Sequence, residues 1–275
     1  MENQTNTTQF VHLNVKSCFS ILNSICKIED IIRKTKEFGN DVAVTDINVM
    51  HTAHDFETKA KKEGIHSIIG CTFLIKSMFI KNEYFCLTLL AKDLRGYKNL
   101  VKLSTIANTQ NNQFPFIEYS DLQNYSIGLF CLTGAESGEI FALEVNHRHE
   151  EAMKIIDYLY NIFNDNLYLE CGYHKIPKER VFLNSGIIDE VKNKYGIKPL
   201  ATNNVYYLNK EHAQYRALAV SMNSQIKDLK RDEVDWLHKY ASRYVDYNSE
   251  FYLKTPDEMD NGLINTPTSY QILWR

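Results

Sequence analysis

The sequence predicts an α/β fold in which parallel strands form a barrel surrounded by helices. Short apolar segments alternate with longer segments whose apolar residues recur every three or four positions. This order is typical of βαβ units, which pair their strands in parallel. About seven such units follow one another, which fits a closed barrel better than an open sheet, although periodicity alone does not distinguish the two.

The first half of the chain contains four predicted strands and three predicted helices. The strands are apolar or alternate with a period of two, and they occupy Phe10–Lys16, Val42–Thr45, Ile65–Ile75 and Phe85–Ala91. The helices occupy Lys27–Phe38, Asn48–Glu63 and Gly96–Ala107. Gly39 and Gly64 directly follow the first two helices, where glycine is a typical helix stop.

The second half repeats the alternation. Strands are predicted at Gly128–Thr133, Leu167–Cys171 and Pro199–Thr202, and helices at His147–Phe163, Lys178–Tyr195 and Lys210–Met222. Thr255 is expected to cap a short helix that begins at Pro256. We therefore expect a disordered lead at residues 1–9, a barrel at 10–222 and a polar C-terminal extension at 223–275.

Composition and charge restrict the class of protein. The chain has 275 residues, of which 44% are hydrophobic, and a net charge of −3. Non-specific DNA binding depends on clustered Lys and Arg, so DNA is expected as a partner only within a larger assembly. The polar start and the lack of a long apolar run predict a cytoplasmic protein without a membrane partner. The six cysteines form no C-x-x-C pair and are expected to be free thiols.

Polar residues are predicted to gather at one end of the barrel. In parallel barrels functional residues collect at the C-terminal ends of the strands. A period of two places His12, Asn14 and Lys16 on one face of the first strand, which we expect to face the barrel interior. The same end is expected to carry polar residues from the other strands: Asp46, Thr72, Asn203 and Asn204.

Several longer segments read FVHLNVKSCFS, VTDINVM, IIGCTF, LLAKDLRGYKNLVKLS, LTGAESGEI, ATNNVYYLNKEHA and NSEFYLKTPDEM. Together they resemble the N-terminal PHP (polymerase and histidinol phosphatase) domain of bacterial DNA polymerase III alpha subunits, in the family's order and across nearly the whole chain. The resemblance implies a distorted TIM-like (β/α)7 barrel of the PHP type.

The resemblance also implies where metal ligands would lie. Family members with intact ligands bind Zn or Mn through His, Asp and Glu, and the polymerase body beyond this domain uses Mg. The aligned positions here, which we call the ligand-equivalent positions, mostly carry other residues: Asn14, Lys16, Asn23, Ile47, Thr72, Cys86, Ala135, Asn204 and Tyr206. No metal, cofactor or catalytic residue is therefore expected in this domain.

The chemistry of these side chains supports that expectation. Neutral amides do not offset the charge of a divalent ion, and the ammonium of Lys16 would repel one. We expect Lys16 to take the cation's place and to pair with Asp46, with help from the amides of Asn14, Asn23 and Asn204. An alternative, in which Lys16 extends to solvent, is left open.

The resemblance implies a role in DNA replication. The parent protein would be a DNA-directed DNA polymerase, a nucleotidyltransferase, whereas this domain alone is expected to be a catalytically inactive scaffold. Its expected partners are the remainder of the alpha subunit and the separate proofreading exonuclease subunit. Two alternatives remain: an active metal-dependent phosphoesterase or 3′–5′ exonuclease using His12, Asp46 and Cys86 as substitute ligands, and a free-standing binding protein.

Overall fold

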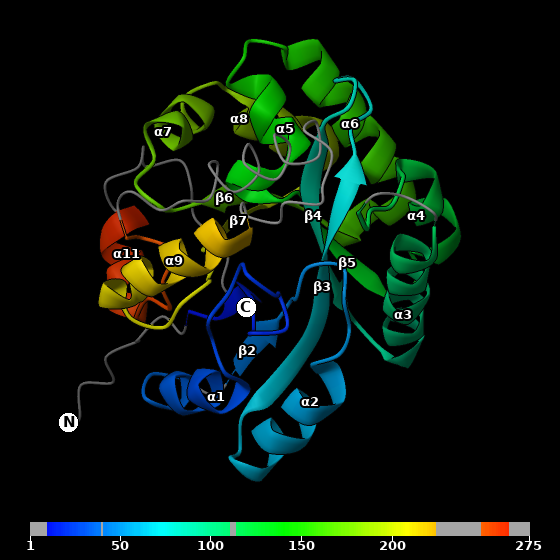
Figure 1. The fold of residues 1–275 in the computed structure, drawn as a ribbon. Coiled ribbons are helices and arrows are strands. Elements are labelled where there is room, and N and C mark those ends of the chain that lie inside the picture. The colour runs from blue at the N-terminus through cyan, green and yellow to red at the C-terminus, as the bar shows by residue number, and fades with distance from the viewer. Residues whose placement is uncertain (1–9, 40, 111–113, 224–248, 264–275) are drawn as a thin grey trace, which may run out of the picture.

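Seven strands form a single sheet that curves into a nearly closed barrel (Figure 1). The computed structural model describes residues 10–39, 41–110, 114–223 and 249–263. Within these residues the strands follow one another around the barrel in chain order: β1 His12–Val15, β2 Asp41–Val44, β3 His66–Lys76, β4 Tyr84–Ala91, β5 Leu129–Leu132, β6 Leu167–Gly172 and β7 Pro199–Thr202.

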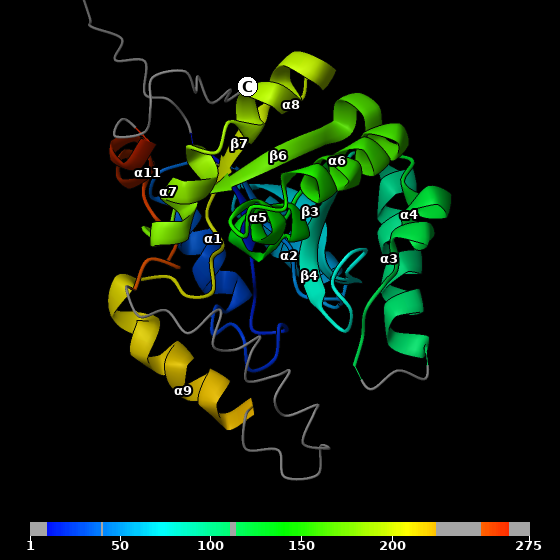
Figure 2. The same ribbon diagram turned by 90° about the horizontal axis from the view of Figure 1, so that it is seen from above.

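Helices surround the barrel on its outside (Figures 1 and 2). The α-helices are α1 Ile28–Lys36, α2 Ala53–Lys62, α3 Leu94–Thr109, α4 Tyr119–Tyr125, α5 Glu139–Glu144, α6 His149–Phe163, α7 Pro177–Leu183, α8 Ile187–Tyr195, α9 Ala213–Asn223 and α11 Pro256–Leu263. Three 3-10 helices accompany them: η1 Ala135–Ser137, η2 Asn164–Asn166 and η3 Lys210–His212. None of the helices in the described part of the chain is both long and apolar enough to cross a membrane.

The expectation of parallel strands throughout is wrong for β4. This strand pairs antiparallel with both β3 and β5, whereas the other pairs are parallel. Residues 77–83 alone join β3 to β4, and a parallel crossover needs a dozen or more residues. The barrel closes beyond β7, where the Lys16 amide donates to Val205 O at 2.9 Å and the Val205 amide donates to Asn14 O at 3.0 Å.

One helical prediction also needs correction, and one helix was not foreseen. The single helix expected at Lys178–Tyr195 is divided into α7 and α8, because Gly186 adopts a left-handed conformation with φ of 87°. Helix α4 was not predicted. It has only seven residues, too few to display a helical period, and it is held by a capping box between Glu118 and Asp121.

Hydrophobic packing occurs on both faces of the barrel wall. Outside, residues such as Leu89, Leu100 and Ile155 pack between the sheet and the helices. Inside, side chains from five strands meet in one cluster: Leu13, Ala43, Leu90, Leu132 and Leu200. This apolar layer fills one end of the barrel interior and leaves the polar groups to the other end.

Residues 249–259, which we call the C-terminal strap, pack against the barrel. Phe251, Leu253 and Met259 are buried, and the Leu253 amide donates to Tyr207 O at 3.1 Å. Thr255 caps α11 as predicted, because its hydroxyl accepts from the Glu258 amide while the Glu258 carboxylate accepts from the Thr255 amide. Residues 249–259, which the sequence assigns to an extension beyond residue 222, therefore pack against the barrel. The expected disordered lead at residues 1–9 lies outside the described residues, as do 224–248 and 264–275.

Candidate functional site

Asn14 lies at the centre of a polar layer inside the barrel. Its side-chain oxygen accepts from the hydroxyls of Thr45 at 2.9 Å and Thr72 at 3.4 Å. Strand β1 is irregular in its pairing with β2, which breaks the simple alternation expected along it. Leu13 consequently joins the interior cluster, whereas His12 contacts the ring of Phe38 outside and bonds Lys254 O at 2.8 Å. The expectation that His12 shares the interior face with Asn14 is therefore wrong.

Lys16 is buried inside the barrel, with only 1% of its surface exposed. Its ammonium donates to the side-chain oxygens of Asn14 and Asn204, the latter at 3.1 Å, and it lies 5.6 Å from the centre of the Tyr206 ring. Burial lowers the pKa of Lys16 to about 8, and the nearby Cys86 and Glu170 oppose this shift. The alternative in which Lys16 extends to solvent is therefore excluded.

Asp46 has a different set of partners from the one predicted. Its carboxylate accepts from the Ser17 amide and hydroxyl, both at 2.7 Å, from the Ser20 hydroxyl at 2.6 Å and from the Thr52 hydroxyl. Among the salt bridges of the described residues there is none between Asp46 and Lys16. The predicted direct pair is wrong, because serines of the loop after β1 satisfy the carboxylate locally.

Two carboxylates that sequence reasoning missed complete the layer. Glu170 of β6 accepts from the Asn14 side-chain amide at 3.3 Å and from the Gly134 backbone at 2.7 Å. Glu136 of η1 accepts from the side-chain amide of Asn204. Burial raises the pKa of both glutamates. A charged residue within the apolar segment LYLEC was a signal for Glu170.

The remaining ligand-equivalent positions carry apolar or locally satisfied groups. Ile47, Cys86 and Tyr206 belong to one apolar cluster that also contains Phe251 of the C-terminal strap. The Thr72 hydroxyl lies 2.9 Å from that of Thr88, and Ala135 is buried at the start of η1. Asn23 is not brought to this layer, because its amide donates to Ile21 O in the exposed loop after β1.

Aromatic and cationic side chains fill the end of the barrel where the strands finish. The guanidinium of Arg216, which is buried, lies 3.9 Å from the centre of the Tyr206 ring and 5.5 Å from that of Phe251. The small cavity beside Asp46 measures about 10 Å³, which is at the lower limit for a single water molecule. Among the described residues, Asn14, Lys16, Thr72 and Asn204 are each at most 3% exposed, so the polar layer has little contact with solvent.

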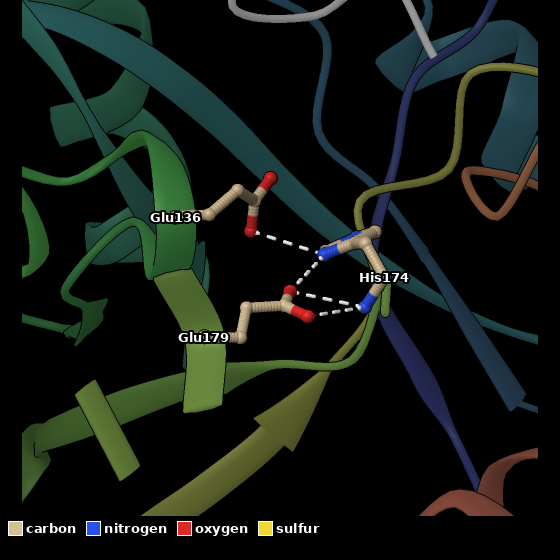
Figure 3. Close-up of side chains that lie close together, drawn as sticks. All are labelled: Glu136, His174 and Glu179. Atoms are coloured by element: carbon tan, nitrogen blue, oxygen red, sulfur yellow. Dashed lines mark hydrogen bonds and ion pairs between the residues drawn. The ribbon is translucent and has the colours of Figure 1, made fainter. Parts of the chain in front are cut away.

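Glu136, His174 and Glu179 form a second buried cluster next to this layer (Figure 3). The Nδ1 atom of His174 lies 2.7 Å from Glu179 Oε1 and 3.3 Å from Glu136 Oε2. Burial raises the pKa of Glu179 to about 7 and also raises that of Glu136. The three side chains offer metal-ligating atoms within 4.8 Å of one another.

The hydrogen bonds of His174 disfavour metal binding by this cluster. Its Nε2 atom accepts a hydrogen bond from the Asn204 backbone amide at 2.9 Å, so we assign the ring proton to Nδ1. A metal at Nδ1 would require the proton to sit on Nε2, where it would face another N–H donor. Glu179 instead accepts from the amides of His174 and Ile176 at the start of α7. The cluster therefore fixes the connection from β6 to α7.

Comparison with known proteins identifies the family. A family model described as PHP domain matches residues 12–174. The chain belongs to the PHP domain family. The sequence resemblance and the barrel fold class are thereby confirmed for this PHP domain, apart from the direction of β4.

The relatives of this PHP domain are much longer than the chain. It is 33% identical to DNA polymerase III subunit alpha of Borreliella burgdorferi over 262 residues, which are 92% of this chain and 22% of the relative. It is 34% identical to the same subunit of Aquifex aeolicus over 237 residues, which are 80% of this chain and 20% of the relative. A solved structure of an amidohydrolase from Chromobacterium violaceum matches with a TM-score of 0.45 and 10% identity, covering 71% of this chain and 87% of that one. The chain spans about a fifth of the length of the two polymerase subunits.

The metal ions that the PHP family implies do not fit the residues of this domain. Zinc and manganese sites are built from imidazoles, thiolates and carboxylates. Here a buried ammonium lies between Asn14 and Asn204, and Tyr206 and Ile47 turn apolar groups to the same end of the barrel. The substitute ligands His12, Asp46 and Cys86 are not gathered either, because Glu136, His174 and Glu179 form the one metal-type cluster among the described residues.

Proposed function

We propose that this PHP domain is a catalytically silent scaffold of a replicative DNA polymerase alpha subunit, to which it belongs as an N-terminal domain. Its role in DNA replication would be structural, and the nucleotidyltransferase chemistry would reside in the remainder of that subunit. The polymerase relatives support this assignment by their names and by their length. A cytoplasmic location is part of the proposal, since bacterial chromosomes are copied there.

One observation supports the proposal that the domain is catalytically inactive. The end of the barrel where a hydrolytic site would open is filled by Tyr206, Arg216 and Phe251. The groups behind them are amides, threonines and an ammonium, together with the carboxylates of Glu136 and Glu170, which accept hydrogen bonds from Asn204 and Asn14. None of these groups lowers the pKa of a water molecule as a bound metal ion does. A phosphoester would therefore meet buried polar groups and no metal-activated water.

We also propose that the outer surface of the domain docks the proofreading exonuclease subunit of the same organism. A domain that has lost its own hydrolytic site would then keep proofreading activity close to the polymerase by binding a separate enzyme. DNA would be met only by the whole polymerase, because the net charge of −3 provides no general attraction for phosphates.

Two measurements test these proposals separately. To test whether the domain lacks hydrolytic activity, the purified domain is incubated with Mn²⁺ or Zn²⁺ and either a chromogenic phosphodiester or a single-stranded oligonucleotide. A PHP protein that has intact ligands is the positive control. Hydrolysis that co-elutes with the domain would contradict the proposal.

To test docking, the domain and the exonuclease subunit are mixed at about 20 μM and analysed by size-exclusion chromatography. We expect the two proteins to elute as a complex. Two separate peaks would refute the docking proposal without affecting the proposal that the domain is catalytically inactive.

A further inference from the structure

The two amides that hold the Lys16 ammonium also hold two buried carboxylates. Asn14 presents its oxygen to the ammonium and its NH₂ group to Glu170. Asn204 presents its oxygen to the same ammonium at 3.1 Å and its NH₂ group to Glu136. Each asparagine thus lies between one cation and one anion, with its own dipole aligned to both.

In this arrangement the Lys16 ammonium balances the negative charge of the buried Glu170 and Glu136 carboxylates. Glu170 is 1% exposed and the side chain of Glu136 is 5% exposed. Among the described residues neither carboxylate forms a salt bridge with a Lys or Arg side chain. Buried carboxylates without a nearby cation are costly. The attraction of Lys16 for Glu170 and Glu136 also opposes the lowering of its pKa by burial.

Among the described residues, the second buried lysine has other partners. Lys254 donates to Tyr173 O at 3.1 Å, to the Asn203 side chain at 3.0 Å and to the Glu250 backbone. Its ion-pair partner is the Glu250 carboxylate at 3.4 Å, which belongs to the C-terminal strap. Lys254 therefore holds the strap, and Lys16 is the ammonium that reaches the Asn14 and Asn204 amides.

We propose that the Lys16 ammonium is a built-in cation that takes the place of a bound metal ion inside the barrel. Its ammonium fills a cation-binding position whose walls are the Asn14 and Asn204 amide oxygens, backed by Glu170 and Glu136. This position lies among the ligand-equivalent positions, so the lysine makes the fold independent of divalent metal ions and closed to them. Truncation of the side chain would leave a latent site for a small alkylammonium ion or a divalent cation. The inference holds whichever partner the domain docks.

The test compares the wild-type domain with Lys16→Ala. We expect the substitution to lower the midpoint of thermal unfolding by roughly 10 °C, because it leaves two buried carboxylates without their cation. Ethylammonium chloride at about 100 mM should restore at least half of this shift, whereas sodium chloride at the same ionic strength should not. Isothermal titration should detect about one Mn²⁺ per Lys16→Ala molecule and none per wild-type molecule.

Arg216→Met is the matched control, because it also removes a buried cation but leaves the Asn14 and Asn204 oxygens occupied by Lys16. It should lower the unfolding midpoint without gaining either ethylammonium rescue or Mn²⁺ binding. The proposal is overturned if Lys16→Ala is as stable as the wild type, if both variants respond equally to ethylammonium, or if the wild-type domain binds one Mn²⁺.

A double variant keeps the test decisive if Lys16→Ala does not fold. Lys16→Met combined with Glu170→Gln removes a cation and an anion together. We expect this double variant to fold and to unfold at a higher temperature than Lys16→Met alone. If removing the carboxylate brings no recovery, Lys16 does not serve as its counter-ion and the proposal is wrong.

Discussion

Phe251→Ala is predicted to destabilise the barrel strongly, although residue 251 lies far beyond the last strand in the sequence. Phe251 is 2% exposed. Its ring stacks on His174 at a centroid distance of 4.2 Å and lies 6.0 Å from the Tyr206 ring. Truncation of a buried phenylalanine costs about 3–5 kcal/mol, and the stacked geometry places this one near the middle of that range, at about 4 kcal/mol.

Urea unfolding followed by circular dichroism measures this loss. Phe19→Ala is the matched control, because Phe19 is 42% exposed and makes a stacked contact with His51 at 6.3 Å. We expect the control to change the free energy of unfolding by less than about 1 kcal/mol. If Phe251→Ala costs no more than Phe19→Ala, the C-terminal strap is not part of the cooperative unit, and the sealed barrel end described above has no energetic basis.

Two further substitutions test the buried charges. Burial lowers the pKa of His12 to about 4. Between about pH 6.5 and 4, His12 therefore binds a proton in the unfolded chain but not in the folded one. Stability due to His12 is therefore lost as the pH falls through that window, by at most about 3 kcal/mol. The unfolding free energy of His12→Gln should fall less than that of the wild type between pH 7 and 4.5. The control is His66→Gln, at an exposed histidine. If it reduces the fall in the unfolding free energy as much as His12→Gln does, the role of His12 is refuted. Glu250→Gln should cost about 3 kcal/mol in urea unfolding at pH 7, because Glu250 and Lys254 are both buried. Glu63→Gln, at an exposed pair with Lys36, should cost less than about 1 kcal/mol, and equal losses would refute the role of Glu250.

The positions of the strands and the placement of Asn14 and Lys16 on one face followed from the sequence because both depend on local periodicity, whereas the burial of Lys16 is known only from the structure. Alternation along β1 placed Asn14 and Lys16 on one face, and the structure confirms this for the pair. The same rule failed for His12, since a local irregularity in β1 shifts the alternation by one residue. The direction of β4 depends on the length of a connection rather than on the composition of the strand, so periodicity alone did not reveal it.

The partners of the buried charges could not be predicted in the same way. Asp46 is satisfied by Ser17 and Ser20, which belong to the loop after β1 and lie 29 and 26 residues away in the sequence. Glu136 and Glu170 meet Asn204 and Asn14 across the barrel, over long sequence separations. Such contacts depend on the closure of the barrel, which no short window of sequence encodes.

The C-terminal strap has a consequence for synthesis on the ribosome. Tyr206 and Arg216 emerge before Phe251, which packs beside them and helps to seal the barrel. At roughly 5–20 residues per second, translation leaves the unfinished domain open for a few seconds. During that interval its aromatic end is available to chaperones. A nascent chain stalled before residue 249 should therefore be captured by them more readily than one extended past residue 263.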